Sequence, residues 1–303
     1  DDTGSRGLGD VYKRQAKEYM KVYGVLVGKK PLIFTNNDSA YETALEFKKN
    51  NVEPIILDTR EEHSSELIDE AKSKGIDIRF SHGVIVANGY KKVKSAKIGK
   101  LNKDKNSFEK IETVDCDCIC VSGFWTPSVH LASQSGNKLK YEEKIDAFIP
   151  DKKKQHETSV GAANGSFTLE ESLKHGFENG SNLSAKITDT KTEIAIPNVN
   201  EKKYGAHDKF WCMPLPKNEN PKRFVDFQND VSVSDIEIAL REGYRSIEHV
   251  KRYTTLGMAT DQGRTSNLNG LQLVSNIENK IVPEVGHTTF RPPFTPITIG
   301  TIV

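Results

Sequence analysis

A polar turn near the start of the chain has residue types that could bind a nucleotide. It follows the apolar run 31–34, precedes a helical pattern, and consists of Thr35, Asn36, Asn37, Asp38 and Ser39. In parallel α/β domains the turn at this place usually reads G-x-G-x-x-G/A and delivers a pyrophosphate to the helix N-terminus. The glycines are absent here, but Asn and Asp tolerate the left-handed backbone that glycine would supply.

An acidic residue, Asp58, ends the next apolar run, about 20 residues further along the chain. At that distance an acid bonds the adenosine ribose hydroxyls and disfavours a 2′-phosphate, which favours NAD over NADP. The alternative is an Asn-rich turn that only caps the following helix. These residues leave the two interpretations equally open.

Two glycine turns later in the chain could contact a flavin dinucleotide. Each follows a predicted strand; the first contains Gly123, Trp125 and Pro127, and the second consists of Gly161, Ala162, Ala163, Asn164 and Gly165. Both look like the late FAD-contacting turns of two-dinucleotide flavoproteins. Ala162 stands where an Asp would bond the ribityl or pyrophosphate part. On these residues alone, two glycine turns of a generic sheet are the favoured interpretation.

Three of the four cysteines, Cys116, Cys118 and Cys120, alternate along a predicted strand over residues 114–121. Alternate side chains on one strand face are ~6.6 Å apart, whereas thiolates that share a zinc ion must come within about 4 Å of each other. We therefore interpret them as buried packing thiols. Cys212 could complete a metal site only if this strand assignment were wrong.

The stretch 224–269 has the layout of an iron–sulfur domain without its ligands. Domains that resemble bacterioferritin-associated ferredoxins carry Cys-x-Cys at a strand end, two short helices and G-M-x-x-C-Q-G-x-x-C. The four ligand positions here hold Asp226, Gln228, Asp261 and Ser266. Because these clusters are held by Cys, and occasionally His, no cluster and no metal are expected in this small helical domain.

The elements that position these residues form an α/β pattern. The predicted order after residue 16 is a helix to about Gly24, a strand at 31–34, a helix at 41–50, a strand at 54–57, a helix at 64–75 and a strand at 76–80. Ser39 and Glu42 form a capping-box signature for the second helix. The alternation predicts a parallel sheet with right-handed crossovers.

Alternating patterns and turn signals follow residue 80. Asn88-Gly89 is a hairpin signal, and the segments 93–101 and 107–114 complete an antiparallel meander. The segment 138–150 reads as a hairpin. Residues 181–222, with several prolines, read as a linker.

Two further helices are expected after the linker. Ser232 and Asp235 form a second capping box, and another helix begins at Ser246. His249, Lys251 and Arg252 lie close together on that helix. We favour a solvated face over a phosphate contact for these cations.

Composition excludes several classes of protein. The 303 residues carry 43 Lys plus Arg against 42 Asp plus Glu, a balance that gives nucleic-acid binding no support. No apolar run approaches the ~20 residues of a membrane span, and no secretory leader is evident. We expect a cytoplasmic protein, with residues 1–15 a disordered or foreign leader.

Several runs together resemble the alpha subunit of heterotetrameric sarcosine oxidase. They are FTNNDSAYETAL, VSGFWTPSVHL, VGAANGSF, FVDFQNDV, ALREGYRSIEHVKRYTTLGMATDQGRTSN and TTFRPPFTP. The resemblance covers nearly everything after residue 15 and implies an internal fragment of a longer subunit. A first FAD strand with its glycine fingerprint would precede it, and an aminomethyltransferase-like folate domain would follow.

The resemblance implies a two-dinucleotide-binding flavoprotein fold followed by a ferredoxin-like helical domain without a cluster. The implied domains are an NAD-binding domain with its meander at 16–113, the C-terminal part of an FAD-binding domain at 114–180, the linker 181–222, the ferredoxin-like domain 223–282, and the start of the connection to the folate domain at 283–303.

The resemblance also implies a division of labour among subunits. The alpha subunit would hold NAD at Thr35–Ser39 and Asp58, and FAD at the two glycine turns. A beta subunit would oxidise sarcosine at its own flavin, and FMN attached to beta would pass electrons to oxygen near the alpha–beta interface. Tetrahydrofolate would accept the one-carbon unit in the absent folate domain, and gamma and delta subunits would complete the complex.

No catalytic residue is assigned to this chain. Lys251 and Arg252 are candidates for contacting the FMN phosphate or the beta subunit. One alternative is the large subunit of N-methylglutamate dehydrogenase or of a related dye-linked dehydrogenase. Another is a non-catalytic nucleotide-binding scaffold. The fragment itself is expected to bind NAD weakly and FAD hardly at all.

Overall fold

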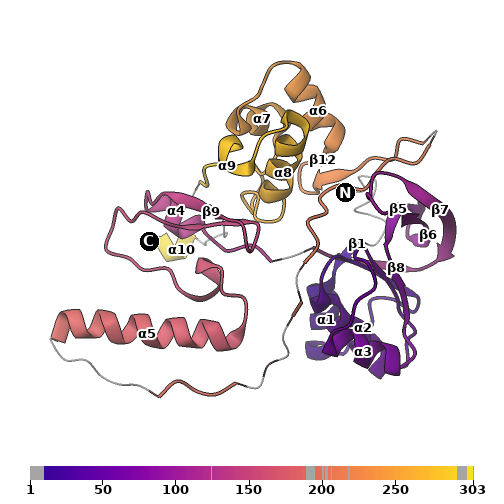
Figure 1. The fold of residues 1–303 in the computed structure, drawn as a ribbon, viewed down its shortest axis with the longest axis horizontal. Helices are drawn as coiled ribbons and strands as arrows, with labels where there is room; N and C mark the ends of the chain where they lie inside the picture. The colour runs from indigo at the N-terminus through magenta and orange to yellow at the C-terminus, as the bar shows by residue number, and fades with distance from the viewer. Residues whose placement is uncertain are drawn as a thin grey trace. The chain divides into compact units, whose positions relative to one another are not determined.

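The structure is a computed structural model that divides into two compact units. It describes residues 10–123, 125–188, 195–199, 201, 204–205, 207–217, 219–291 and 299–302. The first unit comprises residues 1–124 and 202–223, and the second comprises residues 125–201 and 224–303 (Figure 1).

A five-stranded parallel sheet forms the centre of the first unit. Its strands are β1 (Asp10–Tyr12), β2 (Pro31–Thr35), β3 (Ile55–Asp58), β4 (Asp77–Phe80) and β8 (Cys118–Ser122), in the order β1-β8-β2-β3-β4. The connecting helices are α2 (Tyr41–Lys49) and α3 (Glu66–Ser73), and α1 (Lys13–Val22) precedes β2. The predicted parallel α/β order is confirmed. Residues 10–15 lie in β1 and α1, where a leader was expected, while residues 1–9 lie outside the described part.

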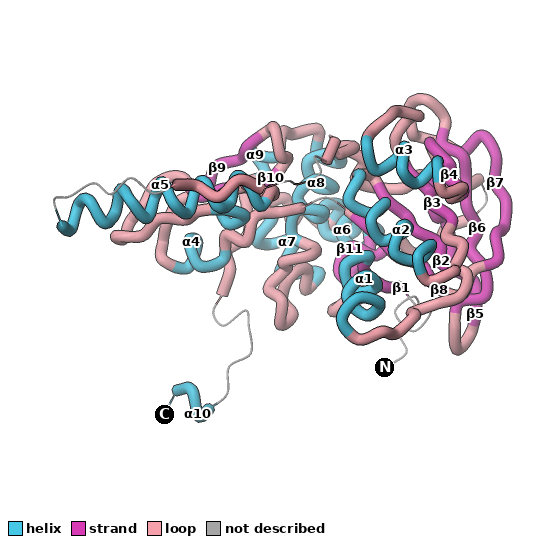
Figure 2. Tube along the Cα trace, turned by 90° about the horizontal axis from the view of Figure 1, so that it is seen from below, coloured by secondary structure: helices cyan, strands magenta, loops and turns pink. Residues whose placement is uncertain are grey.

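The two faces of this sheet are covered by different layers. Residues of alternate parity point to opposite faces of a strand, so Ile33 packs with the helices and Leu32 packs with the meander. The helical side includes Tyr41, Phe47 and Ile68, all fully buried. Figure 2 shows α2 and α3 on one side of β2–β4 and the meander on the other. Burial of each such large side chain contributes about 1.5–3 kcal/mol.

The meander consists of β5 (His82–Gly89), β6 (Val93–Leu101) and β7 (Phe108–Asp115), all antiparallel. The hairpin formed by β5 and β6 was predicted, but its turn is displaced from the predicted position. Gly89 still pairs with Val93, so residues 90–92 form the turn instead of Asn88-Gly89. A Cβ at Gly89 would lie 2.0 Å from the Lys92 carbonyl oxygen, so the glycine is needed for this close backbone approach.

The predicted strand 114–121 is two strands with a break between them. β7 ends at Asp115 and β8 begins at Cys118. Cys118 and Cys120 pack on the helical side, whereas Cys116 packs on the meander side. All three cysteines are buried and form no disulfide, so the packing role is confirmed, although the prediction of a single shared face was wrong. Burial raises the pKa of Cys116 to about 11.

The capping box expected at Ser39 and Glu42 is wrong. A short 3-10 turn, η2 (Asp38–Ala40), precedes α2, and its cap is Asn37. Asn37 Oδ1 accepts from the Ser39 backbone N–H at 3.1 Å and from the Ser39 hydroxyl at 2.5 Å. Glu42 instead accepts from Tyr204 at 2.8 Å, because the tertiary contact replaces the local one.

The second unit contains a hairpin, two helical turns and a long helix before its helical domain. These are α4 (His130–Gln134), β9 (Leu139–Glu142), β10 (Ala147–Pro150), η3 (Gly161–Asn164) and α5 (Leu169–Thr188). The predicted hairpin is antiparallel. Helix α5 continues beyond residue 180, where the linker was expected to begin. No helix in the described part of the chain is long and apolar enough to cross a membrane.

The ferredoxin-like domain has more helix than the two expected segments. It contains β11 (Phe224–Asp226), β12 (Val231–Ser232), α6 (Val233–Arg241), α7 (Ile247–Thr254), α8 (Asn267–Glu278) and α9 (Val282–Val285), and α10 (Ile299–Ile302) follows. The capping box is confirmed, because the Ser232 N–H donates to Asp235 Oδ2 at 2.8 Å. Helix α8 was not predicted from the sequence, because the residues that follow Gly257 are mostly polar.

Candidate functional site

The candidate site lies at the carboxyl ends of the central strands of the first unit. Register places Thr35 beside both Asp58 and Ser122, because β2 pairs with β3 on one side and with β8 on the other. The chain order reverses at β2, since β3 and β4 follow on one side and β8 returns on the other. Ligands of open α/β sheets bind at such a reversal. The sheet therefore brings Thr35–Ser39 and Asp58 together.

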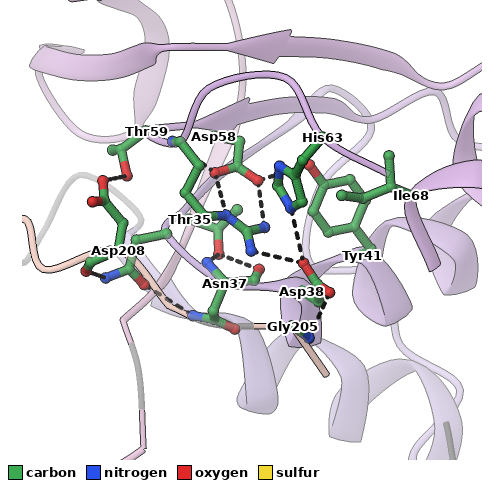
Figure 3. A network of polar contacts seen from close by, with 12 residues as sticks. Thr35, Asn37, Asp38, Tyr41, Asp58, Thr59, His63, Ile68, Gly205 and Asp208 are labelled. Atoms are coloured by element: carbon green, nitrogen blue, oxygen red, sulfur yellow. Dashed lines mark hydrogen bonds and ion pairs between the residues drawn. The ribbon is translucent and has the colours of Figure 1, made fainter. Parts of the chain in front are cut away.

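Arg60 binds both acidic residues of this site. Its Nε and one terminal nitrogen donate to the two Asp58 carboxylate oxygens at 2.9 and 2.7 Å. Its other terminal nitrogen lies 2.8 Å from Asp38 Oδ1. Both carboxylates are fully buried, and Tyr41 donates to Asp58 at 2.8 Å (Figure 3). A bidentate contact between Arg and a carboxylate is geometrically specific and strong.

The charges of this cluster are matched despite their burial. Burial alone would raise the pKa of Asp38, but the Gly205 N–H and the Arg60 guanidinium hold it below its ordinary value. Burial would lower the pKa of Arg60, but Asp58 and Asp38 raise it. Burial and the Asp58 charge raise the pKa of Tyr41. Asp38 is therefore an ionised partner of a permanently charged guanidinium, which also binds Asp58.

The two asparagines of the turn use their side chains within the protein. Asn37 Nδ2 donates to the Gly123 carbonyl at 2.6 Å, which links the carboxyl ends of β2 and β8. Asn36 Nδ2 donates to the Asp208 carbonyl at 3.0 Å. Both residues are buried. The helix-cap interpretation of Asn37 is thus realised through η2, and Asn36 has a tertiary role.

A segment far away in sequence covers these strand ends. We call its described residues 204, 205 and 207–210 the strap. Gly205 N–H donates to Asp38 Oδ2 at 2.8 Å, and Asp208 N–H donates to the Asn36 carbonyl at 3.0 Å. Thr59 Oγ1 donates to the Asp208 carboxylate at 3.0 Å, and Lys105 Nζ binds the same oxygen. Figure 3 shows Gly205 and Asp208 against the turn and strand ends.

This arrangement does not fit a dinucleotide. A pyrophosphate needs a close approach to the turn backbone, for which the usual motif supplies glycines. Here Asn36 and Asn37 stand in that turn, and the strap covers it. Asp58, expected to bond ribose hydroxyls, already accepts from Arg60 and Tyr41. The residues predicted for NAD are brought together, but their hydrogen-bonding groups are engaged within the protein.

The residues predicted for FAD are divided between the two units. Gly123 belongs to the first unit, and Trp125, Pro127 and residues 161–165 belong to the second. Gly123 has open space where a Cβ would be. The turn 161–165 is the 3-10 turn η3, and Gly161 and Gly165 have φ of +60° and +86°, which only glycine adopts readily. The FAD role of these residues stays a prediction.

Asp226 joins the strand, loop and helix of the ferredoxin-like domain. Its Oδ1 accepts from the Gln228 N–H at 2.9 Å, and its Oδ2 accepts from the Gly257 N–H at 2.8 Å and from the Ser266 hydroxyl at 3.4 Å. Asp261 accepts from the Gly263 N–H at 3.1 Å. Three of the four ligand positions are thus in contact, because Asp226 accepts from the Gln228 backbone and from the distant Ser266 side chain.

A buried asparagine side chain lies beside this contact. Asn267 is buried between two glycines with left-handed backbones, and a Cβ on Gly257 or Gly263 would come within 2.1 Å of Asn267 Oδ1. In the described part of the chain, no group of three or more His, Cys, Asp or Glu side chains is placed to hold a metal ion.

Lys251 is not a solvated cation. It is buried, and its Nζ donates to the Thr289 carbonyl at 3.0 Å, while Glu248 accepts from the Thr289 N–H at 2.6 Å. Burial lowers the pKa of Lys251. Arg252 is exposed. The two cations grouped together in the sequence therefore differ, and the internal role of Lys251 leaves Arg252 as the candidate for an external anion.

Two residues that complete the site were not anticipated from the sequence. Arg60 follows Asp58 by two positions, and an acid followed by a base at one strand end could have been recognised in the sequence as an ion pair. Asp208 carried no such signal, because it lies in a proline-punctuated segment and reaches the site only through the tertiary fold.

Comparison with known proteins finds similarity to sarcosine oxidase alpha subunits along nearly the whole chain. Residues 220–303 match the family described as Sarcosine oxidase A3 domain. The sarcosine oxidase subunit alpha of Rhizobium meliloti (strain 1021) is 32% identical over 291 residues, which cover 94% of this chain and 28% of the relative. That of Corynebacterium sp. (strain P-1) is 29% identical over 297 residues, covering 94% of this chain and 30% of the relative.

A solved structure shows the fold. The L-proline dehydrogenase from P.horikoshii superposes with a TM-score of 0.62 at 18% identity, covering 97% of this chain and 54% of that chain. The two-dinucleotide-binding flavoprotein fold with a small helical domain is thereby confirmed. The predicted resemblance is confirmed as well: over 94% of its length this chain is related to sarcosine oxidase alpha subunits, and it spans less than a third of their length.

Proposed function

We propose that this chain is part of the alpha subunit of a sarcosine oxidase complex. The observation that carries the proposal is the similarity to alpha subunits along 94% of the chain, at up to 32% identity. It extends through both units and includes the helical domain matched at residues 220–303. A shared fold alone would not support an activity, whereas this similarity spans the turns and helices discussed above.

The proposed complex is a cytoplasmic oxidoreductase of one-carbon metabolism. It would convert sarcosine to glycine, with hydrogen peroxide and methylenetetrahydrofolate as further products. Beta, gamma and delta subunits would be its partners, with FMN attached to beta and tetrahydrofolate bound outside the present chain. The amine would be oxidised in the beta subunit, so this chain would bind cofactors and dock partners and contribute no proton-transfer residue.

The nucleotide roles within the chain are part of the same proposal. FAD would be held by residues 123, 125, 127 and 161–165. NAD would be held by Thr35–Ser39 and Asp58 in an arrangement more open than the one described. Bound NAD would supply hydride chemistry, and this chain's own contribution would be to position the adenosine ribose.

A second candidate is a scaffold that performs no nucleotide chemistry. The engaged side chains of Asn36, Asn37 and Asp58 favour it for the first unit. Under this proposal the sheet would serve only to hold the subunit's shape and its partner surfaces.

The test is to assemble the complex from the complete reading frame together with its neighbouring subunits. Under the first proposal, sarcosine drives stoichiometric release of hydrogen peroxide, and rapid NAD reduction by the complex eliminates the scaffold for the NAD site. Turnover of N-methylglutamate with dye acceptors, and none with sarcosine, would instead assign the complex to the dye-linked dehydrogenases.

A further inference from the structure

The strap occupies the turn after β2 and the residue next to Asp58, where a dinucleotide would bind. A dinucleotide brings phosphates to the turn after β2 and ribose hydroxyls to the acid after β3. At the turn, the strap pairs Asp208 with Asn36 through two hydrogen bonds of 3.0 Å, one of them to the Asn36 carbonyl. Beside the acid, it accepts from the Thr59 hydroxyl. Strap and dinucleotide therefore exclude each other.

The strap also brings negative charge to this place. The Asp208 carboxylate lies at the carboxyl ends of β2 and β3, where a nucleotide phosphate would bring its own charge. Lys105, from the turn between β6 and β7, binds this carboxylate and lies 5.7 Å from the centre of the Phe210 ring. The Asp208–Lys105 pair is about one-fifth exposed. Water can therefore reach this ion pair, which we call the latch, whereas the Asp38 and Asp58 carboxylates are fully buried.

The fit of the strap is close at its other end. Gly205 donates to Asp38, and a Cβ added at Gly205 would come 3.0 Å from Asp38 Oδ2. Tyr204 donates to Glu42 on α2. The strap is therefore anchored at both ends of the turn and contacts the acid that Arg60 holds.

We propose that the strap is an intramolecular competitor of adenine dinucleotides for the carboxyl ends of β2 and β3, latched by Asp208 with Lys105. The proposal rests on the proposed nucleotide role of Thr35–Ser39 and Asp58. In the latched form Arg60 satisfies Asp58 and Asp38. Release of the strap uncovers the turn and frees the Thr59 hydroxyl, and a dinucleotide can then bind.

Competition has a thermodynamic consequence that can be measured. When only a fraction of the molecules is open, the apparent dissociation constant rises by the inverse of that fraction. A change that weakens the latch therefore tightens nucleotide binding without touching a nucleotide contact. Conversely, bound nucleotide must increase the fraction of molecules in which the strap is released, because linkage is reciprocal.

Fluorescence of Trp211, which follows the strap directly, provides the readout. The chain has two tryptophans, and Trp125 is unchanged in every variant, so a difference between titrations reports on Trp211. NAD is titrated into the parent, Asp208→Ala and Glu219→Ala. Glu219 is the matched control, because it also binds a meander lysine, Lys97, at 2.5 Å but has no contact with the strand ends among the described interactions.

The expected result is that Asp208→Ala binds NAD about tenfold more tightly than the parent, as for loss of a partly buried ion pair, and that Glu219→Ala matches the parent. Lys105→Ala breaks the same latch from the meander side and should act in the same direction. It serves as the second variant if Asp208→Ala does not fold, as judged by circular dichroism.

Equal affinities of the parent and both latch variants would overturn the competitor, and so would tighter binding by Glu219→Ala. Absence of NAD binding in all of these proteins would also overturn it, because the strap would then compete with nothing. Sarcosine turnover by the assembled complex is an independent measurement, so failure of the strap proposal is distinguishable from failure of the proposed function.

Discussion

The Asp38–Asp58 cluster of the first unit and the Asp226 cluster of the second can be compared directly. The sequence pattern of the first is that of a nucleotide site, and the pattern of the second is that of an iron–sulfur site without its ligands. Each is a buried carboxylate site whose oxygens are engaged within the protein. They differ in what engages them.

Side chains and a distant segment hold the first cluster. Arg60 supplies the positive charge, and Gly205 reaches Asp38 from 167 residues away in sequence. Asp226 instead accepts from the backbone N–H groups of Gln228 and Gly257 and from the Ser266 hydroxyl. A cluster held by side chains and a strap can open without unfolding its sheet, whereas Asp226, which binds two backbone N–H groups and the Ser266 hydroxyl, joins segments that cannot separate without unfolding the domain. The first is suited to a gate, and the second to a structural replacement of a cluster.

The largest expected effect is from Arg60→Ala. It leaves Asp58 and Asp38 buried without their cation, which typically costs 3–5 kcal/mol of unfolding free energy. Hydrogen exchange of the α2 and β3 amides measures it in the first unit alone. Arg79→Ala is the control: Arg79 also pairs with two acids, Asp77 and Glu112, but on a more exposed surface, so a loss of at most about 1 kcal/mol is expected. Similar losses for both variants would contradict a special stabilising role of the buried Arg60 contacts with Asp58 and Asp38.

Asp226→Ala should destabilise the second unit by roughly 2–4 kcal/mol, because it leaves buried N–H donors without an acceptor. Hydrogen exchange of α8 reports the loss, while exchange of α2 stays unchanged. Asp261→Ala, at a half-buried former ligand position, should cost about 1 kcal/mol. Asp226→Asn keeps one acceptor oxygen and should lie between the two. If the alanine variants rank in the reverse order, Asp226 is not the central contact.

Lys251→Met should cost about 1–2 kcal/mol, because the Thr289 carbonyl loses its donor. Arg252→Met is the matched control and should change stability by no more than about 0.5 kcal/mol, since it is a surface substitution. Thermal unfolding followed by circular dichroism compares the two. An equal loss at Arg252 would show that both cations are structural and would remove the remaining candidate for an external anion.

Acidification is expected to give the smallest effect, because it acts mainly through one buried carboxyl group, that of Asp38. Its pKa is lower in the folded than in the unfolded protein. The stabilisation is therefore complete above the unfolded value, 3.8, and is lost as pH falls through the folded pKa. Exchange of α2 amides from pH 5 downwards measures this loss. Asp38→Asn should reduce its slope, and an unchanged slope would assign the pH dependence to other groups.

The central strands β2, β3 and β4 of the first unit, their helices and their parallel order were predictable, because hydrophobic periodicity encodes them locally, whereas β1 and α8 were not predicted. Ser232 and Asp235 were recognisable as a cap for the same reason. The hairpin at Asn88-Gly89 was predicted, but its turn was displaced, since the turn position depends on strand register as well as on local residues. Cys116 does not share a face with Cys118 and Cys120, because it lies between the end of β7 and the start of β8. No strong composition signal marks this boundary between the two strands.

The sequence by itself determined the α/β framework of the first unit, the ferredoxin-like layout without cysteines and the resemblance to alpha subunits of sarcosine oxidase. All of these depend on residue types at short, fixed spacings. Only the tertiary structure decided that Asp58 is bound by Arg60, that Asn36 meets Asp208 and that Asp226 joins Gly257 and Ser266. These contacts satisfy buried polar groups, and their partners are chosen by three-dimensional proximity, which local patterns do not encode.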